Sequence, residues 1–586
     1  MVGHPSPYLA MHAQDPVRWQ TWSAGTLELA RRLNRPLLIS VGYFSCHWCH
    51  VMQRESFQDQ ELAEHINSAF VPVKIDRELQ PALDDYLMDF VRVTRGQAGW
   101  PLTVFLTPDG YPLLGVTYQP RDDFAALLND LHQRWLKDGE SLQVLARDAL
   151  REWEVLREAA QKSGSDAKDF TRDFLRQVEQ RQDEMSGGFG QQSKFPMAAQ
   201  LQALLWLRAQ HDDTRFDDFI RLTLDSMADG GLHDLLGGGF FRYVTDPLWQ
   251  TPHYEKMLYD NAWLALLYMQ AADQLQSARY RRIGLSTVDF LMREMRTPGG
   301  WFISSFSAVD DQGREGCYYL WNQGELQEQL NPEQLKAVTA AWFDPQDPGA
   351  DCGKLPRLQR PLVDVAEQLK WQPEKLHRVL ESARSRLLDA RGRRGLPADR
   401  KGIAAWNGLT LSALAAAHTS SGDQAYAVAA SALVDHVMRH WWDGTRLVRA
   451  TRGEKVVAAA TPDDYALVAR GLWDWKQIEP ASVDEKAIAQ MVRRAWRLFY
   501  RKDRWVLDQE PLIPMLGGRI AVEDGSLPSA SAVIAELSVQ VQSTRVDAAL
   551  KSNVTAHLEH VQSRLGNAAF WYAGYLKLLA GDQPLR

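Results

Sequence analysis

Two cysteines separated by two residues, Cys46 and Cys49, constrain the fold of this chain more than any other feature. They directly follow residues 36–42, an apolar run with the length of a buried strand, and they open a helical pattern. At the start of a helix, free N–H groups and the helix dipole stabilise a thiolate and lower the pKa of a cysteine. We therefore expect Cys46 to act as a nucleophile and Cys49 to resolve the mixed disulfide that forms.

Three further residues belong to the same candidate site. His47 lies between the cysteines and would favour the thiolate by adding positive charge. Pro101 follows Trp100 at the start of a later strand, where a proline is expected to have a cis peptide bond and to face the cysteine pair. The candidate catalytic residues are Cys46, His47, Trp48, Cys49 and Pro101.

The motif has three competing interpretations. Cys-x-x-Cys-His also attaches c-type haem, but that use needs an exported chain and an axial ligand. A zinc site at Cys46, Cys49 and His50 lacks a second pair of ligands nearby. Two buried thiols with a purely structural role are the third interpretation. The position between a strand and a helix favours the redox interpretation, and we expect no metal and no other cofactor.

Strand and helix patterns alternate from residue 1 to about residue 160. After the cysteines come a helix, a strand at 70–76 and another helix. Two strands at 101–106 and 111–116 follow, connected by a Pro-Asp-Gly turn, and then a helix through Phe124 and Leu131. This order, β-α-β-α-β-β-α, is that of the thioredoxin fold, which we assign to residues 1–160.

The rest of the chain is expected to be almost entirely helical. A polar stretch at 161–166 is typical of a linker, and beyond it apolar residues recur with the 3.6-residue period of helices. Helices end repeatedly in a Gly or Asp turn with tryptophan, as at Trp301, Trp441 and Trp505. Such recurrent hairpins indicate a solenoid or a closed toroid, and periodicity does not decide between them. We assign residues 169–586 to this second domain.

Composition excludes several classes of protein. The formal net charge of −8 argues against nucleic acid as a partner, and no apolar run approaches the ~20 residues that span a bilayer. The first residues lack the features of a signal peptide, so the expected location is cytoplasmic. Four cysteines are too few for a disulfide scaffold, and we expect Cys317 and Cys352 to be isolated, unreactive thiols.

Several stretches together resemble one known family. They are Ser6-Pro7-Tyr8-Leu9, Gly42-Tyr43, Cys46 through Met52, Glu55-Ser56-Phe57, Lys74 through Glu78, and Gly99 through Gly110. Over nearly its whole length the chain is similar to the thioredoxin-domain family whose animal members are called spermatogenesis-associated protein 20 and whose bacterial members are YyaL-like. The resemblance implies a thioredoxin-like α/β domain followed by an all-α (α/α)6 toroid akin to six-hairpin glycosidases and N-acylglucosamine 2-epimerases. The chain departs from the family pattern at Ala98, where glycine is usual, and at Leu79-Gln80, where Glu-Arg is usual.

The helical part carries a second candidate site. Thr251 and Pro252 have the pattern of a helix N-cap and first helical residue, which would place His253 and Glu255 in the first turn beside a central pocket. The 21 tryptophans would suit stacking on sugar rings, although tryptophan also fills seams between helices. The candidate pocket residues are His233, His253, Glu255, Asp260, Trp406, Asn407, Asp463 and Asp464.

Two chemistries fit these pocket residues. Glu255 with Asp463 or Asp464 would supply the acid and base of glycoside cleavage. Alternatively, His233 and His253 would exchange a proton beside a sugar carbonyl. Each residue also has an ordinary structural role, because Asp463 suits a helix cap, His233 a core histidine and Glu255 the positive end of a helix dipole.

The sequence leaves three hypotheses open. The first is a thiol–disulfide oxidoreductase or redox sensor that acts on a protein dithiol or disulfide, which the intact cysteine pair favours. The second is a carbohydrate-active enzyme, an epimerase, isomerase or glycosidase with a small sugar-like ligand, in which the thioredoxin-like domain is structural or regulatory. The third is an interaction scaffold in which neither site is active.

Overall fold

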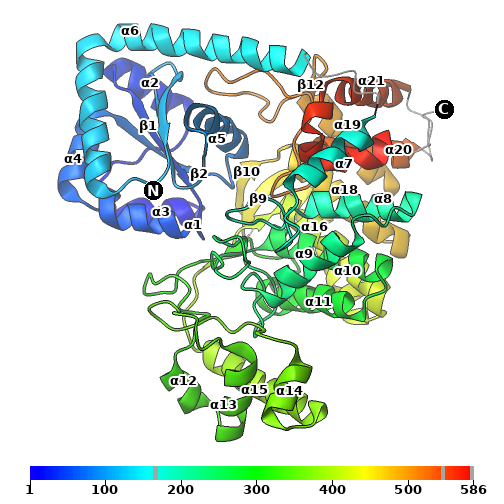
Figure 1. Ribbon diagram of the computed structural model, residues 1–586. Coiled ribbons are helices and arrows are strands. Elements are labelled where there is room, and N and C mark those ends of the chain that lie inside the picture. The colour runs from blue at the N-terminus through cyan, green and yellow to red at the C-terminus, as the bar shows by residue number, and fades with distance from the viewer. Residues whose placement is uncertain (163–168, 454, 543–547, 581–586) are drawn as a thin grey trace.

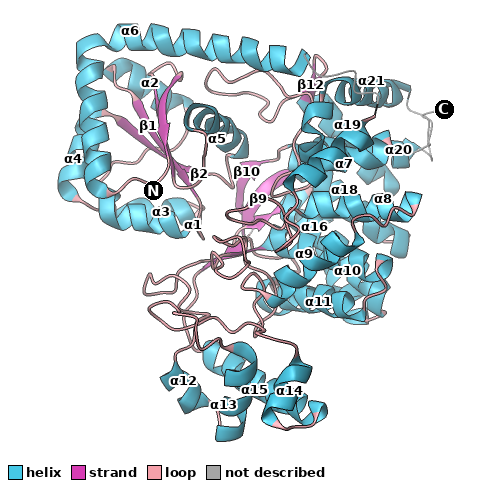
Figure 2. Ribbon diagram, viewed as in Figure 1, coloured by secondary structure: helices cyan, strands magenta, loops and turns pink. Residues whose placement is uncertain are grey.

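The computed structural model describes residues 1–162, 169–453, 455–542 and 548–580. Its N-terminal part contains a four-stranded sheet in the order β2-β1-β3-β4, with β1 parallel to β2 and antiparallel to β3 (Figure 1, Figure 2). In chain order, β1 to β4 span Leu37–Gly42, Val71–Asp76, Leu102–Leu106 and Pro112–Val116. The strand and helix order predicted from the sequence is confirmed, and this part has the thioredoxin-like fold.

Alternation along β1 explains how helices cover both faces of this sheet. Leu37, Ile39 and Val41 pack with one set of helices, whereas Leu38 packs with the other. The first set is α2 (Ala24–Leu33) and α5 (Pro81–Arg95), and the second is α3 (His47–Met52), α4 (Gln60–Ala69) and α6 (Arg121–Lys162). All six residues of β1 are therefore buried, as an apolar run of this length predicts.

Helix α6 is much longer than the domain needs and reaches the second domain (Figure 1). Near its end, the carboxylate of Glu154 accepts the N–H of Gly517, and Arg157 donates to the carbonyl of Gly517. Residues 161 and 162 of the linker predicted at 161–166 are still helical. The rest of that linker, residues 163–166, lies outside the described residues.

The second domain is a closed ring of helices, so the toroid is confirmed and the solenoid is excluded. Six inner helices contact one another in succession, and the last contacts the first. They are α8 (Ala198–His211), α10 (Leu258–Gln274), α16 (Ala404–Ser421), α18 (Pro462–Ile478), α20 (Ala530–Gln542) and the 3-10 helix η5 (Gly566–Tyr575). The outer helices are α7 (Phe170–Arg181), α9 (Asp217–Asp229), α11 (Ala278–Phe290), α17 (Gln424–His436), α19 (Glu485–Phe499) and α21 (Ala548–Arg564).

Additional elements are inserted between α11 and α16. Four helices form a lobe with its own apolar core around Leu376 and Leu380 (Figure 1). They are α12 (Gln323–Gln329), α13 (Pro332–Trp342), α14 (Leu362–Leu369) and α15 (Pro373–Arg391). A disulfide joins Cys317 and Cys352 beside this lobe. The prediction of two isolated thiols is therefore wrong, because the folded loops bring together cysteines that are 35 residues apart.

Two small antiparallel sheets lie at the end of the toroid that faces the thioredoxin-like domain. Their strands are β5 (Lys256–Met257), β6 (Ser305–Phe306) and β7 (Ala398–Asp399) in one, and β8 (Gly402–Ile403), β9 (Val448–Arg452) and β10 (Lys455–Ala459) in the other. Figure 2 shows β9 and β10 between the two domains. Within the described ranges, no helix has an apolar stretch long enough to cross a membrane.

Candidate functional site

The cysteine pair lies at the start of α3, immediately after β1. Cys46 is the N-cap residue of this helix, its Sγ accepts the N–H of Cys49 at 3.2 Å, and the two residues form a disulfide. The Trp100–Pro101 peptide bond is cis, as is usual for a proline at this position of the thioredoxin fold. Both cysteines are almost fully buried, with 3% of Cys46 and 2% of Cys49 exposed, whereas 43% of Trp48 is exposed.

Two segments of the toroid, residues 253–257 and 304–317, cover the cysteine motif, and we call them the covering loops. The Tyr43 hydroxyl and the Ser45 hydroxyl donate hydrogen bonds to the two carboxylate oxygens of Glu255 at 2.9 and 3.1 Å. The N–H of Ala308 donates to the Ser45 carbonyl at 3.1 Å. Arg242 pairs with the same Glu255 carboxylate at 3.1 Å. The toroid therefore contributes a charged, hydrogen-bonded wall to the redox centre.

Two histidines and a glutamate extend this wall beside Cys46. Nε2 of His47 lies 3.3 Å from a carboxylate oxygen of Glu315, and Nε2 of His253 lies 3.7 Å from the other. Burial and His253 lower the pKa of His47 to about 4, so it is neutral at pH 7. Burial thus opposes the positive charge that the sequence predicted between the cysteines. Burial and Glu255 raise the pKa of Glu315 to about 7, which places its titration in the neutral range.

Glu255 keeps its charge in spite of its burial. Burial raises its pKa, but Arg242, His253 and the Tyr43 hydrogen bond oppose burial and the net pKa is lowered. Glu255 thus presents a carboxylate to the thioredoxin-like domain rather than a proton donor.

The helix start predicted at Thr251 and Pro252 is wrong. Pro252 forms a β-bridge with Val244, the strand β5 pairs with β6, and α10 begins only at Leu258. The N–H of His253 donates to the Tyr243 carbonyl at 2.9 Å, so the segment is held extended by its neighbour. This tertiary pairing overrides the local capping signal, and it directs Glu255 to the domain interface instead of the toroid centre.

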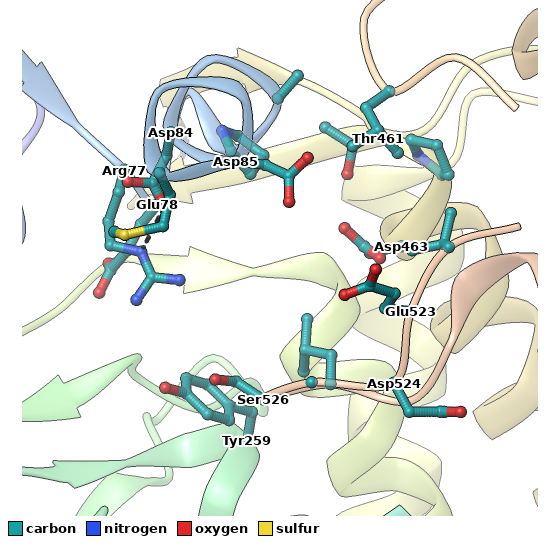
Figure 3. A pocket seen from close by; sticks show the side chains of 18 of the residues that line it. Arg77, Glu78, Asp84, Asp85, Tyr259, Thr461, Asp463, Glu523, Asp524 and Ser526 are labelled. Atoms are coloured by element: carbon teal, nitrogen blue, oxygen red, sulfur yellow. Dashed lines mark hydrogen bonds and ion pairs between the residues drawn. The ribbon is translucent and has the colours of Figure 1, made fainter. Parts of the chain in front are cut away.

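A cavity of about 620 Å³ lies between the domains, at the mouth of the toroid (Figure 3). The N-terminal ends of α10, α16 and α18 and the loop before α20 form its floor, and the segment from Arg77 to the first turns of α5 forms its opposite side. Its polar and aromatic lining residues include Arg77, Glu78, Asp84, Asp85 and Trp100 from the first domain and Tyr259, Trp406, Asp463, Glu523 and Asp524 from the second.

Carboxyl groups dominate the electrostatics of this cavity. Burial raises the pKa of Asp463 to about 6, against the opposing effect of Arg449, and burial raises the pKa of Asp524 to about 6. Arg77 is already paired with Asp84 at 3.1 Å, and Arg449 with Asp464 at 3.1 Å. These arginines are therefore engaged within the protein, and the cavity offers two carboxyl groups that titrate just below neutral pH.

One hydroxyl at the cavity floor has no partner in the described part of the chain. Tyr259 is buried against the Trp406 ring at 4.7 Å, and its hydroxyl makes no hydrogen bond there. A buried hydroxyl without a partner costs roughly 1–3 kcal/mol, so it is a ready donor or acceptor for a polar ligand.

The structure divides the predicted pocket residues among different places. Trp406 and Asp463 line the cavity. The Asp464 carboxylate accepts the N–H of Thr461 at the start of α18. The Asn407 side chain accepts the N–H of Phe302 and donates to the Phe302 carbonyl. Asp464 and Asn407 thus have structural roles.

The two predicted histidines also lie apart from the cavity lining. His233 packs on Phe240 at 4.9 Å, and His253 stacks on Tyr243 at 5.1 Å beside the redox centre. Asp260 on α10 is half-buried, and desolvation raises its pKa although Arg242 opposes the shift. Glu255 is not among the residues that line the cavity, so the predicted pairing of Glu255 with Asp463 does not form there.

Sequence reasoning missed the residues that connect the domains. Lys401 binds Asp76, Glu78 and Asp399 at 2.7, 3.0 and 2.9 Å, and Arg449 donates to the Glu78 carbonyl. Asp76 and Glu78 belong to a stretch that carries the family resemblance, but nothing local in the sequence points to Lys401. In the described residues, no group of three or more His, Cys, Asp or Glu side chains is placed to hold a metal ion.

Known proteins match both parts of this architecture. The family model described as "Thioredox_DsbH: Protein of unknown function, DUF255" matches residues 1–154. Uncharacterized protein B0495.5 of Caenorhabditis elegans is 30% identical over 80% of this chain and 70% of its own length. Human spermatogenesis-associated protein 20 is 33% identical over 81% of this chain and 66% of its own length.

Solved structures are similar only at a distance. The cellobiose 2-epimerase of Bacillus thermoamylovorans has a TM-score of 0.44 and 10% identity, over 68% of this chain and 87% of its own. The sequence relatives carry the assignment, because their similarity extends through both domains. The chain therefore belongs to the family of thioredoxin-domain proteins that includes spermatogenesis-associated protein 20.

Proposed function

We propose that this protein is a thiol–disulfide redox protein that works through Cys46 and Cys49. The observation that carries the proposal is the disulfide at the N-terminus of α3, in a thioredoxin-like domain and with Cys46 as the N-cap residue. A cysteine at this position is stabilised as a thiolate by the free N–H groups of the first turn. The Cys46 thiolate would therefore attack a substrate disulfide, and in the oxidised protein Cys46 would be the sulfur that a substrate thiolate attacks. Cys49 would resolve the mixed disulfide on Cys46.

The test is a glutathione redox titration of the full chain, with thiols trapped and counted by mass spectrometry. We expect Cys46 and Cys49 to interconvert reversibly between dithiol and disulfide. Cys49→Ser should accumulate a mixed disulfide on Cys46, and Cys46→Ser should not form one at Cys49. A pair that stays in one state across the titration would contradict the proposal. The Cys317–Cys352 pair, followed in the same spectra, is an internal reference.

A second candidate function is a carbohydrate-active enzyme centred on the interdomain cavity. The unpartnered Tyr259 hydroxyl, the aromatic wall of Trp406 and the raised pKa of Asp463 favour it, because sugars need stacking faces and an acid that holds its proton. The acid would be Asp463 and the second carboxyl Glu523 or Asp524, rather than Glu255.

This second function is tested by a screen of mono- and disaccharides for turnover and for binding by calorimetry. Asp463→Asn should abolish turnover with little loss of binding, and Tyr259→Phe should weaken binding. Asn407→Asp is not a useful control, since Asn407 supports the fold. Exposed Asp109 is the matched control, and Asp109→Asn should leave turnover unchanged. No binding of any sugar would count against the function.

A further inference from the structure

We infer that Cys46 exchanges with low-molecular-weight thiols and disulfides of glutathione size, and that folded proteins are excluded from it. This inference rests on the proposed redox function and specifies the substrate class of that site. The observation behind it is the juxtaposition of a redox pair with the covering loops of the toroid, residues 253–257 and 304–317.

The cysteine pair is buried. Exchange requires a sulfur to approach the Cys46 sulfur along the axis of the disulfide bond, and so depends on access. Only 3% of Cys46 and 2% of Cys49 is exposed. A protein disulfide brings its own surrounding backbone to the site, which must sit in the space that the covering loops occupy.

The covering loops are attached to the motif itself. The Ser45 residue next to Cys46 is held through both its hydroxyl, by Glu255, and its carbonyl, by the N–H of Ala308. Gly316 donates in turn to the Ala308 carbonyl, so the loop is linked internally as well. Swinging these loops away would deprive the buried Glu255 carboxylate of the Tyr43 and Ser45 hydroxyls and leave it only Arg242 among these partners, which is costly.

The domain interface holds the loops in place over a wider area. Lys401 of the toroid pairs with Asp76 and Glu78 of the thioredoxin-like domain, and Arg519 pairs with Asp85 and Asp89. Lys401, Asp76 and Glu78 are buried, so a hinge motion would have to separate buried charges from their partners. A hinge motion that admits a folded protein is therefore disfavoured.

Solvent reaches the edge of the covered region beside His47. Glu315 is 33% exposed and contacts His47, and Trp48 on the same turn is 43% exposed. A small thiol could approach Cys46 through this edge alone, because, unlike a folded protein, it has few atoms besides its sulfur. His47 is neutral at pH 7, so the edge offers a hydrogen-bonding ring without a positive charge.

The exchange balances with two molecules of thiol. A thiolate RS⁻ attacks Cys46 Sγ, the Cys46–Cys49 bond breaks, and Cys49 leaves as a thiolate that takes up a proton from solvent. A second RS⁻ attacks the mixed disulfide, releases RSSR and leaves Cys46 as a thiolate. Overall, two RSH are oxidised to one RSSR and the protein disulfide is reduced to a dithiol.

The test compares oxidants of increasing size on the reduced full chain. The probes are oxidised glutathione, a disulfide-bonded peptide of about ten residues, and insulin, and the rate is that of Cys46–Cys49 disulfide formation by thiol trapping. We expect glutathione disulfide to react at least about 100-fold faster than insulin, with the peptide between them, because access limits the rate. Cys46→Ser corrects for background oxidation at other thiols.

The outcomes separate this inference from the proposed function. Insulin reacting as fast as glutathione disulfide would overturn the substrate class and leave the redox function intact. No reaction with any probe would overturn the redox function and the inference with it. In Glu315→Ala, which opens the edge beside His47, the ratio of glutathione to insulin rates should fall. A ratio that stays the same or rises would contradict the placement of the entrance at this edge.

Discussion

At the scale of single residues, the hydroxyl of Tyr8 lies behind the redox pair without a partner. A Cβ atom placed on Gly42 would lie 2.3 Å from the Tyr8 hydroxyl oxygen and 2.8 Å from Cys49 Sγ. The hydroxyl and the sulfur therefore both lie close to Gly42. Tyr8 is fully buried, and within the described residues nothing bonds to its hydroxyl. In the dithiol form Cys49 would become a free sulfur next to this donor.

Tyr8→Phe is therefore expected to stabilise the disulfide relative to the dithiol. In the wild type, the Tyr8 hydroxyl is unpaired in the disulfide form and would gain the Cys49 sulfur as an acceptor on reduction. The variant has no hydroxyl, so its dithiol form lacks this stabilising hydrogen bond. A net hydrogen bond of roughly 1 kcal/mol corresponds to a shift of about fivefold in the equilibrium with glutathione. The check is a glutathione titration of both chains. Tyr86→Phe is the matched control, because its hydroxyl is also buried and has no partner among the described residues, but Tyr86 belongs to α5 and packs near Trp153. If Tyr86→Phe shifted the equilibrium with glutathione by a similar factor, a hydrogen bond from Tyr8 to Cys49 would not be the cause.

The same site shows which residues can be predicted from a sequence. Cys46 and Cys49 follow from local pattern, because the strand before them and the helix that they open fix their placement. Glu315 and Arg242 do not, because each meets the motif across about 200 residues or more of intervening chain and through loops without periodicity. Their roles depend on how two domains dock, and that is invisible to any window of the sequence.

At the scale of elements, the same limit explains the segment from Thr251 to Met257. Serine and threonine predict helix starts because their hydroxyls accept free N–H groups, and proline because it has no N–H to leave unpaired. A neighbouring extended segment can satisfy the free N–H groups as well. Here residues 242–244 do so, and the helix begins at Leu258. By contrast, the inner helix α16 was predictable because its small apolar residues recur along its whole length.

Close packing of α16 on α18 depends on two glycines. A Cβ atom on Gly471 would lie 2.2 Å from the Gly408 carbonyl oxygen, and one on Gly408 would lie 2.4 Å from the Leu467 carbonyl. Gly471→Ala should therefore destabilise the toroid by about 1–3 kcal/mol, because backbone atoms cannot give way as a side chain can. Thermal unfolding followed by circular dichroism measures this. Gly25→Ala on α2, where the nearest atom is 3.9 Å away, should be neutral or stabilising. Equal losses in both variants would refute the packing argument.

At the scale of the whole molecule, one buried lysine connects the domains. Lys401 Nζ contacts Asp76 and Glu78 of the thioredoxin-like domain and Asp399 of the toroid, and all four side chains are buried. Three carboxyl groups share a single cation. Burial raises the pKa of Glu78 and of Asp399, and Lys401 opposes that shift. The interface therefore depends on this lysine for its charge balance.

Lys401→Met should destabilise the protein by about 3–5 kcal/mol at pH 8, because three buried carboxyl groups lose their cation. The folded-state pKa values of Glu78 and Asp399, which are already raised, should rise further in the variant. A carboxyl group whose pKa is higher in the folded state than in the unfolded state binds more protons when folded, so stability falls as pH rises above the unfolded value of about 4. The deficit of the variant relative to the wild type should thus be largest at pH 8 and smaller at pH 5.

Apparent melting temperatures of both chains at pH 5 and pH 8 measure this deficit. Arg31→Met is the control, because Arg31 and Asp109 form an exposed pair at 2.9 Å that contributes little at either pH. A deficit that is equal at the two pH values would show that Lys401 acts by packing and not by charge. A deficit that shrinks at pH 5 would identify the carboxyl cluster as the group that holds the toroid against the redox domain. The covering loops would then remain over Cys46 for as long as those carboxyl groups keep their cation.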